Sequence, residues 1–223
     1  MFRLNVSPEL RAHCPHYRCA AVCAEVTNTP FSQGLWQEID SFTRELRATC
    51  TTDSIKLQPA IAATREAYKL CGKDPSRYRP SAEALRRRLL RGLELYRIDT
   101  LVDLINLVSL RTGYSIGGFD ADKIQGSVLE LGIGHAGEEF EGIGRGTLNI
   151  EGLPVWRDGK GGIGTPTSDH ERTKMDLGTR RILAIINGYD GNTEALERAA
   201  AMTGELLRRY AASDGGTVAE AEG

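Results

Sequence analysis

The sequence predicts an α+β fold in which a mostly antiparallel sheet packs against several helices. Apolar residues recur at helical spacing through residues 31–112, short apolar runs separated by glycines fill residues 114–188, and helical spacing returns in residues 192–210. Helices and strands therefore follow one another in blocks, which is typical of α+β and not of alternating α/β folds. We expect residues 1–210 to form a single domain and residues 211–223, with little apolar surface, to be a disordered tail.

Two strands are expected near the N-terminus. Residues 2–6 alternate apolar and polar side chains, the pattern of a half-buried strand, and residues 17–26 are short, apolar and partly alternating. After a break containing Pro30, apolar residues at helical spacing predict a helix over residues 31–48 and a shorter one over residues 59–70.

Two further helices precede the glycine-rich half of the chain. The first is expected to begin with Ser81 as its N-cap. The second begins with Thr100 and Asp103 as a capping-box pair and ends at Gly113. Asn106 lies within the apolar run of this second helix. Because a buried amide needs hydrogen-bond partners, Asn106 is either a structural clamp or part of a pocket wall.

Charge excludes one function class and singles out one segment. A net charge of -2 excludes a general nucleic-acid coat, which needs an excess of Lys and Arg. One cluster is nevertheless strongly basic, with six arginines between Arg77 and Arg91 and Glu83 as the single acid. It is either a solvated helix face or a surface that contacts RNA phosphates. The arginines assigned to RNA binding are Arg86, Arg87, Arg88 and Arg91.

Three other motifs fit structural roles better than chemical ones. GIGHAG (132–137) has the letters of a dinucleotide-binding turn, but the glycines after it cannot sustain the required helix, so we expect a β-hairpin. GKGGIGTPT (159–167) lacks the order of a phosphate-binding loop. HCPHYRCAAVC (13–23) could surround zinc, yet no second ligand pair follows, which favours buried thiols. We expect no metal and no cofactor.

Cellular context is predicted from two patterns. The chain has no apolar run long enough to span a bilayer, and its start lacks the basic-then-apolar order of a secretory signal. Five cysteines, an odd number, fit reduced thiols better than a disulfide framework. We therefore expect a cytoplasmic protein.

Residues 97–144 resemble the B3/B4 domain of the phenylalanyl-tRNA synthetase β subunit. Three motifs carry the likeness in the family's order and spacing: VDLIN (102–106), FDADKI (119–124) and GEEF (137–140). With the segments around RPSAEALRRRLLRG and GTPTSDHERTK included, the chain is similar to freestanding B3/B4 proteins over residues 1–190. The resemblance implies a B3/B4-like fold. The synthetase's ATP-binding core has no counterpart among these motifs.

The resemblance also implies an activity and some of its residues. In the synthetase this domain is the editing module, which hydrolyses the ester of tRNA charged with tyrosine in place of phenylalanine. The family's helix asparagine corresponds to Asn106. The chain departs from the family at Gly117, where the synthetase has a histidine. The family's G-G-E-H stretch corresponds to Asp169 and His170, our candidate catalytic residues.

The segment GIGTPTSDHERTK (162–174) is the candidate site loop. Backbone N–H groups and hydroxyls at Thr165, Thr167 and Ser168 can bind an amino group or an ester, and Asp169 or His170 can orient the attacking water. The alternative is that Asp169 and Arg172 form an ion pair that only stabilises a turn. The substrate-binding assignment comprises Asn106, Gly117, Gly118, Phe119, Thr165, Thr167, Ser168, Arg172 and Thr173, with Gly117 and Gly118 as candidate donors to the oxyanion.

Together these features predict a tRNA-binding protein that deacylates mischarged aminoacyl-tRNA in trans. The expected partner is tRNA or aminoacyl-tRNA, not DNA or a membrane, and the oligomeric state stays open. A tRNA-binding module without catalysis and a small-molecule (amino acid) binding protein are the alternatives. The prediction requires that Asn106 and the loop at 162–174 line one cavity.

Overall fold

The computed structural model describes residues 2–221 and has the expected α+β composition. Three short 3-10 helices, at Ile55–Leu57, Ala121–Lys123 and Glu171–Thr173, lie between the main elements. The main elements, in chain order, are β1 (Arg3–Val6), α1 (Pro8–His13), β2 (Arg18–Glu25), α2 (Gln33–Thr49), α3 (Pro59–Leu70), α4 (Ser81–Leu90), α5 (Thr100–Thr112), β3 (Ser115–Asp120), β4 (Val128–Ile133), β5 (Glu141–Gly142), β6 (Gly146–Thr147), β7 (Pro154–Arg157), β8 (Gly162–Gly164), β9 (Arg181–Gly188), α6 (Thr193–Tyr210) and β10 (Thr217–Glu220).

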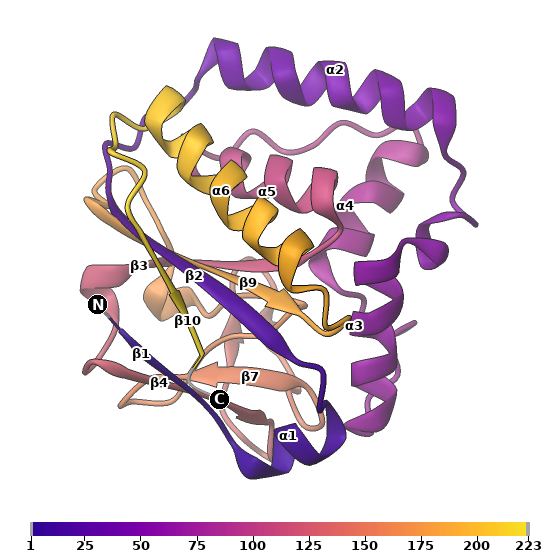
Figure 1. Cartoon of the computed structure of the whole chain (residues 1–223), viewed down its shortest axis with the longest axis vertical. Coiled ribbons are helices and arrows are strands. Elements are labelled where there is room, and N and C mark those ends of the chain that lie inside the picture. Colours follow the sequence, from indigo (N-terminus) through magenta and orange to yellow (C-terminus); the bar gives the residue numbers. More distant parts are fainter. Residues whose placement is uncertain (1, 222–223) are drawn as a thin grey trace.

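Two four-stranded sheets organise the molecule. The first has the strand order β10-β2-β9-β3 and is antiparallel throughout. The second has the order β1-β4-β7-β8, in which β1 and β4 are parallel and the remaining pairs antiparallel. Strands β5 and β6 form a separate two-stranded hairpin. In Figure 1 helices α2, α5 and α6 lie on one side of the first sheet, and the second sheet lies on the other side.

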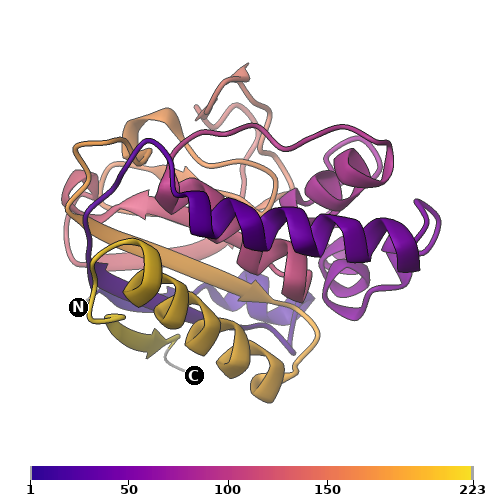
Figure 2. The same ribbon diagram turned by 90° about the horizontal axis from the view of Figure 1, so that it is seen from above.

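The first sheet separates two apolar cores, and β9 contributes to both. Ile182, Ala184 and Ile186 pack with residues of α2, α5 and α6. Leu183 and Ile185 face the other way and pack against the second sheet. Successive side chains of a strand point to opposite faces, which explains why β9 is apolar throughout and not alternating. In Figure 2 the long helices α2 and α6 lie in front of the strands; α6 packs on β2 and β9, whereas α2 packs on α4 and α5.

The predicted helices are present, but their N-terminal caps differ from the expectation. Ser81 is the first residue of α4, and no side chain caps that helix, so the Ser81 cap is wrong. Asp99 caps α5 by accepting a hydrogen bond from the N–H of Val102 at 2.9 Å. Asp103 instead accepts a hydrogen bond from Nε1 of Trp36 at 2.6 Å, so the Thr100–Asp103 capping box is wrong as well. Gly113 ends α5 in the left-handed conformation, as expected.

The C-terminal tail differs from the disordered segment that its composition predicts. Residues 217–220 form β10, which pairs with β2 through backbone hydrogen bonds. Val218 remains 51% exposed, so apolar burial contributes little to this strand. The open edge of β2 supplies unpaired backbone groups, which composition alone does not reveal.

The remaining motifs have structural surroundings. No helix follows GIGHAG: β4 ends at Ile133, and the β5–β6 hairpin comes next. Cys14 and Cys19 are buried in the second core, and residues 2–221 contain no group of His, Cys, Asp and Glu side chains arranged to hold a metal ion. Across the same residues, no helix has the length and apolar character to cross a bilayer.

Candidate functional site

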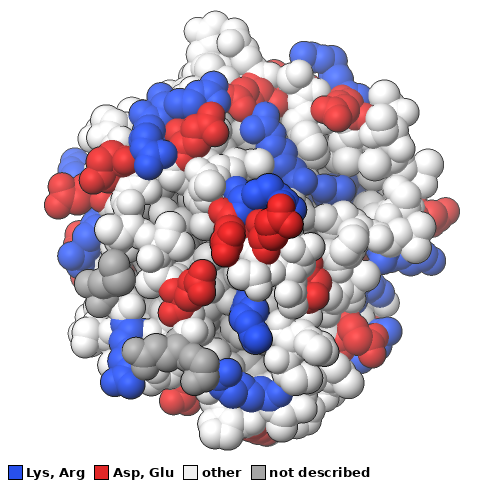
Figure 3. All heavy atoms as spheres, in the orientation of Figure 1, with Lys and Arg blue, Asp and Glu red and all other residues white. Residues whose placement is uncertain are grey.

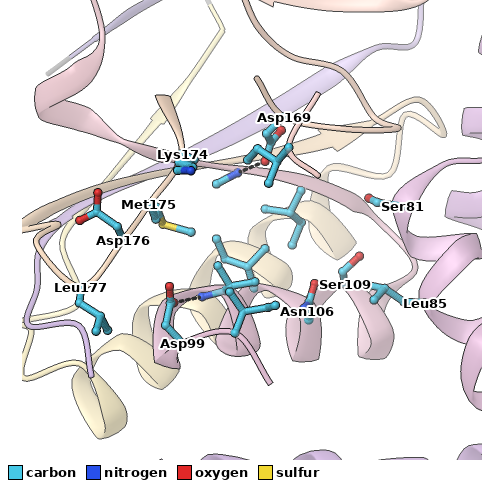
Figure 4. A pocket seen from close by; sticks show the side chains of 16 residues that line it. Ser81, Leu85, Asp99, Asn106, Ser109, Asp169, Lys174, Met175, Asp176 and Leu177 are labelled. Atoms are coloured by element: carbon cyan, nitrogen blue, oxygen red, sulfur yellow. Dashed lines mark hydrogen bonds between the residues drawn. The ribbon is translucent and has the colours of Figure 1, made fainter. Parts of the chain in front are cut away.

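A cavity of about 520 Å³ lies between α5 and the segment that follows β8. Figure 4 shows Asn106 entering it from α5 and Asp169 from the opposite side. The cavity is mostly apolar, with polar groups at a few places in its wall. It is lined by Ser81, Leu85, Ile98, Asp99, Val102, Ile105, Asn106, Ser109, Ile116, Gly118, Ile143, Asp169, Lys174, Met175, Asp176 and Leu177.

Asn106 is a polar group of the cavity wall and is half-buried. The preceding turns of α5 bury Leu101, Leu104 and Ile105, so Asn106 lies at the border of the apolar stripe. Within residues 2–221 its side-chain amide makes no hydrogen bond. A half-buried amide without protein partners is available to bind a ligand.

Asp169 lies at the free edge of β3. Its Oδ2 accepts a hydrogen bond from the N–H of Gly118 at 3.0 Å, which satisfies a backbone donor that no strand pairs. Two glycines make room for this carboxyl. A Cβ at position 164 would lie 2.8 Å from Oδ1 of Asp169, and one at position 117 would lie 3.3 Å from the same atom.

Burial in this surrounding changes the acidity of Asp169. It raises the pKa of the carboxyl to about 7, although the hydrogen bond from Gly118 opposes the shift. At neutral pH both protonation states are therefore populated. A carboxyl group with this pKa can act as a general base or a general acid at physiological pH.

His170, the next residue, faces a different hollow. This second hollow is polar, has a volume of about 850 Å³, and includes Glu141, Lys160 and Arg172 in its wall. The ring Nδ1 accepts a hydrogen bond from the N–H of Arg172 at 3.0 Å. Burial, together with the charge of Arg172, lowers the pKa of His170. Asp169 and His170 therefore do not line the same cavity.

The three hydroxyl residues of the loop are engaged in holding its shape. Oγ1 of Thr165 accepts hydrogen bonds from the N–H groups of Thr167 and Ser168, at 3.2 and 3.0 Å. Oγ1 of Thr167 lies 2.8 Å from the hydroxyl oxygen of Tyr68, and Ser168 donates to the carbonyl of Asp169 at 3.4 Å. None of the three hydroxyl residues is among the lining residues of the cavity.

Arg172 is held by Asp158 and not by Asp169. Its two terminal nitrogens each donate to a carboxylate oxygen of Asp158 at 2.9 Å, and that carboxylate is fully buried. The alternative of an Asp169–Arg172 ion pair is therefore wrong. Thr173 is buried below the loop and donates to the carbonyl of His170 at 3.5 Å. Phe119 is also fully buried, and its ring lies against Gly117 and Gly164.

A comparison with protein-family models now decides the family. The model of the B3/4 domain matches residues 63–211. The chain belongs to the B3/4 domain family. Among solved structures, it is similar to the crystal structure of an N-terminal fragment of the phenylalanyl-tRNA synthetase β-subunit from Pyrococcus horikoshii, with a TM-score of 0.49 and 16% sequence identity. The match covers 97% of this chain and 50% of that fragment, so the chain spans half the length of the structure it matches. No curated protein sequence gives a significant match.

The arginines assigned to RNA binding differ in burial and in their contacts in this B3/4 domain. Arg86 is buried, and its Nη2 donates to the carbonyl of Leu110 at 2.5 Å, so its guanidinium is directed inward. Arg87 forms an ion pair with Glu83 at 3.0 Å, and Arg88 lies over the ring of Tyr96 at 4.0 Å. Arg91 is exposed.

Several wall residues of this B3/4 domain were not expected. Ile143 comes from the β5–β6 hairpin, Ile98 from the segment before α5, and Met175 from the segment after the loop. Each is an ordinary apolar residue outside a long periodic run, so no local pattern identifies it. Leu85, in contrast, belongs to the apolar residues that recur at helical spacing through residues 31–112.

Proposed function

We propose that this B3/4 domain binds the acylated 3′ end of tRNA and hydrolyses the ester of a mischarged aminoacyl group in the cavity. One observation carries the proposal: the unpartnered amide of Asn106 and the buried carboxyl of Asp169 line the same cavity. A volume of about 520 Å³ lies within the range of pockets that hold small ligands.

The proposed reaction uses Asp169 as general base. The ionised carboxylate takes a proton from a water molecule, and the resulting hydroxide adds to the ester carbonyl. The bond between that carbon and the ribose oxygen then breaks, and the proton held by Asp169 passes to the departing ribose hydroxyl. The free amino acid and the uncharged tRNA leave, and Asp169 returns to its starting state. Asn106 binds the aminoacyl group during these steps.

The environment of Gly117 supports this role for Asp169. Gly117 stands where the resembling synthetase domain has a histidine. A Cβ at this position would lie 2.6 Å from the Phe119 ring and 3.3 Å from Oδ1 of Asp169, so the ring and the carboxyl together fill the space into which a side chain at 117 would extend. We infer that Asp169 supplies the proton-transfer group that the glycine lacks.

A deacylation assay tests the proposal. Purified protein is incubated with a panel of tRNAs, each charged with a non-cognate amino acid, and the loss of the ester is followed against buffer. We expect accelerated hydrolysis of at least one ester, lowered about 100-fold or more by Asp169→Asn. His170→Asn, which changes the neighbouring residue outside the cavity, is the matched control and leaves most of the rate.

The other outcomes distinguish the alternatives. Acceleration of no ester on the panel contradicts the hydrolase proposal. The glycine at position 117 favours a tRNA-binding module in that case, and salt-sensitive tRNA binding without deacylation would support it. A higher melting temperature with free amino acids, without affinity for tRNA, would support a small-molecule binding protein.

A further inference from the structure

Six arginines from three separate segments line a groove of about 270 Å³ on the surface near α4. Arg77 and Arg79 precede α4, Arg87, Arg88 and Arg91 lie on or just after it, and Arg145 comes from the β5–β6 hairpin. We call this feature the arginine groove. Arg145 is 54 positions away from Arg91 in the sequence, so the groove is a product of the fold and not of one basic segment.

The arginine groove carries a large excess of positive charge. Within residues 2–221, the carboxylate that pairs with its members is that of Glu83, which contacts Arg87 at 3.0 Å and Arg79 at 3.8 Å. Glu83 is also shared with an arginine outside the groove. Arg77, Arg91 and Arg145 are exposed and form no ion pair among the described residues. By contrast, the face in Figure 3 mixes basic and acidic side chains.

The arginine groove and the cavity have no lining residue in common, but neighbouring residues of the same two elements line them. On α4, Ala84 lines the groove and Leu85 lines the cavity. On the β5–β6 hairpin, Ile143 lines the cavity and Arg145, two residues later, lines the groove. The N–H of Ile143 donates to the carbonyl of Asp169 at 3.0 Å, which fixes the hairpin to the loop that carries the carboxyl. Helix α4 and the β5–β6 hairpin therefore contribute to the walls of both hollows.

An exposed aromatic ring lies next to the arginine groove. Tyr96, outside the groove wall, is 67% exposed, and the guanidinium of the wall residue Arg88 lies over its ring at 4.0 Å. Leu93, in the groove wall, is 51% exposed. Positive grooves combined with exposed aromatic rings are typical of sites that bind single-stranded nucleic acids, because phosphates bind the cations and bases stack on the rings.

We propose that the arginine groove binds the single-stranded RNA segment that leads to the acylated end, with Arg77, Arg91 and Arg145 contacting its phosphates. The terminal ribose then enters the cavity between Leu85 and Ile143. The direction of the strand rests on the proposed function, whereas the binding of single-stranded RNA in the groove does not. Of the four arginines that the sequence assigns to RNA binding, the proposal keeps Arg91 as a phosphate contact and leaves out the buried Arg86, and it adds Arg77 and Arg145.

Binding of an uncharged oligoribonucleotide without secondary structure tests the proposal. Fluorescence anisotropy gives its Kd for the full chain over a series of salt concentrations. The variant Arg77→Gln/Arg91→Gln/Arg145→Gln should weaken binding at low salt at least tenfold and reduce the slope of log Kd against log salt by about 2, as expected for three lost phosphate contacts on a single strand. The control Arg44→Gln/Lys56→Gln/Arg198→Gln removes the same charge from exposed positions elsewhere.

The outcomes are separable from those of the deacylation assay. Equal effects of the two triple variants, or no effect of the groove variant, would overturn the groove proposal even if the wild-type protein deacylates tRNA. Groove-dependent RNA binding by a protein without deacylase activity would contradict the proposed function and support the groove. Polyglutamate that competes with the RNA at equal charge concentration would overturn the choice of RNA as the occupant. An unchanged melting temperature of both variants verifies that they are folded.

Discussion

Asp169 and His170 are neighbours in the chain, yet they line different hollows. Asp169 faces a mostly apolar cavity and His170 a polar one. The backbone here forms isolated bridges, of Asp169 with Gly164 and of His170 with Gly142. Successive side chains of such extended backbone point to opposite sides. The comparison shows that one step along the loop changes the surroundings of a titratable group completely.

Burial acts on both residues but moves their pKa values in opposite directions. It raises the pKa of the Asp169 carboxyl and lowers that of the His170 ring, because burial disfavours whichever form is charged. At neutral pH the acid is therefore partly protonated and the base is mostly neutral. The difference in surroundings between Asp169 and His170 can be tested by changing first the ion pair that holds the loop and then each of the two residues.

The largest effect is expected from the ion pair that holds the loop. Asp158→Ala removes the fully buried carboxylate that accepts both hydrogen bonds of Arg172 and the N–H of Gln125. Leaving the guanidinium without its partner should lower the free energy of unfolding by about 3 kcal/mol. Chemical denaturation measures it. Lys160→Ala, at an exposed position in the same turn, is the control, and an equal loss in both variants would contradict the role of the pair.

A stabilisation is expected next, from Asp169→Asn. The folded-state pKa of Asp169, about 7, lies above its unfolded value, so the folded state binds more protons between about pH 4 and pH 7 and loses stability as pH rises through that window. The asparagine retains an acceptor for Gly118 and removes the buried charge. Its free energy of unfolding should exceed that of the wild type by at least about 2 kcal/mol at pH 8 and match it below about pH 4. A gain that does not depend on pH would contradict the assignment.

The same group should shape the pH dependence of deacylation. A general base acts only when ionised, so a pKa of about 7 predicts a rate that rises roughly tenfold from pH 6 to pH 8 and then levels off. Spontaneous ester hydrolysis, measured without protein at each pH, is subtracted. A net rate that continues to rise in proportion to hydroxide would show that Asp169 is not the base.

The parts of the structure that the sequence predicts depend on local patterns. The helix that ends at Gly113 was predicted from apolar spacing and a glycine at its end, because both signals lie within a few residues. Asn106 stands out in the sequence because an amide interrupts an apolar stripe. The B3/4 family is likewise predicted from motifs of four to six consecutive residues, and the family match confirms it.

The parts that the sequence does not predict depend on contacts between distant segments. Arg86 and Arg87 are adjacent in one basic run, but the packing of α4 against α5 buries one and leaves the other half-exposed. Thr165 and Thr167 have the composition of a binding loop, yet their hydroxyls hold the loop itself. Arg172 pairs with Asp158 and not with Asp169, which is nearer in sequence, because the fold of the chain brings Asp158 next to it.

The smallest effect is expected at His170, with the opposite sign of pH dependence from that at Asp169. The lowered folded-state pKa means that the unfolded state binds more protons below about pH 6.5, so His170 reduces stability as pH falls through its titration. His170→Asn should therefore flatten the loss of stability between pH 7 and pH 5, by less than about 1 kcal/mol because the ring keeps contact with water. Melting temperatures at pH 5, 6 and 7 measure this change. If His170→Asn leaves the loss of stability between pH 7 and pH 5 unchanged or makes it steeper, the ring does not titrate with a lowered folded-state pKa and this account of His170 is wrong.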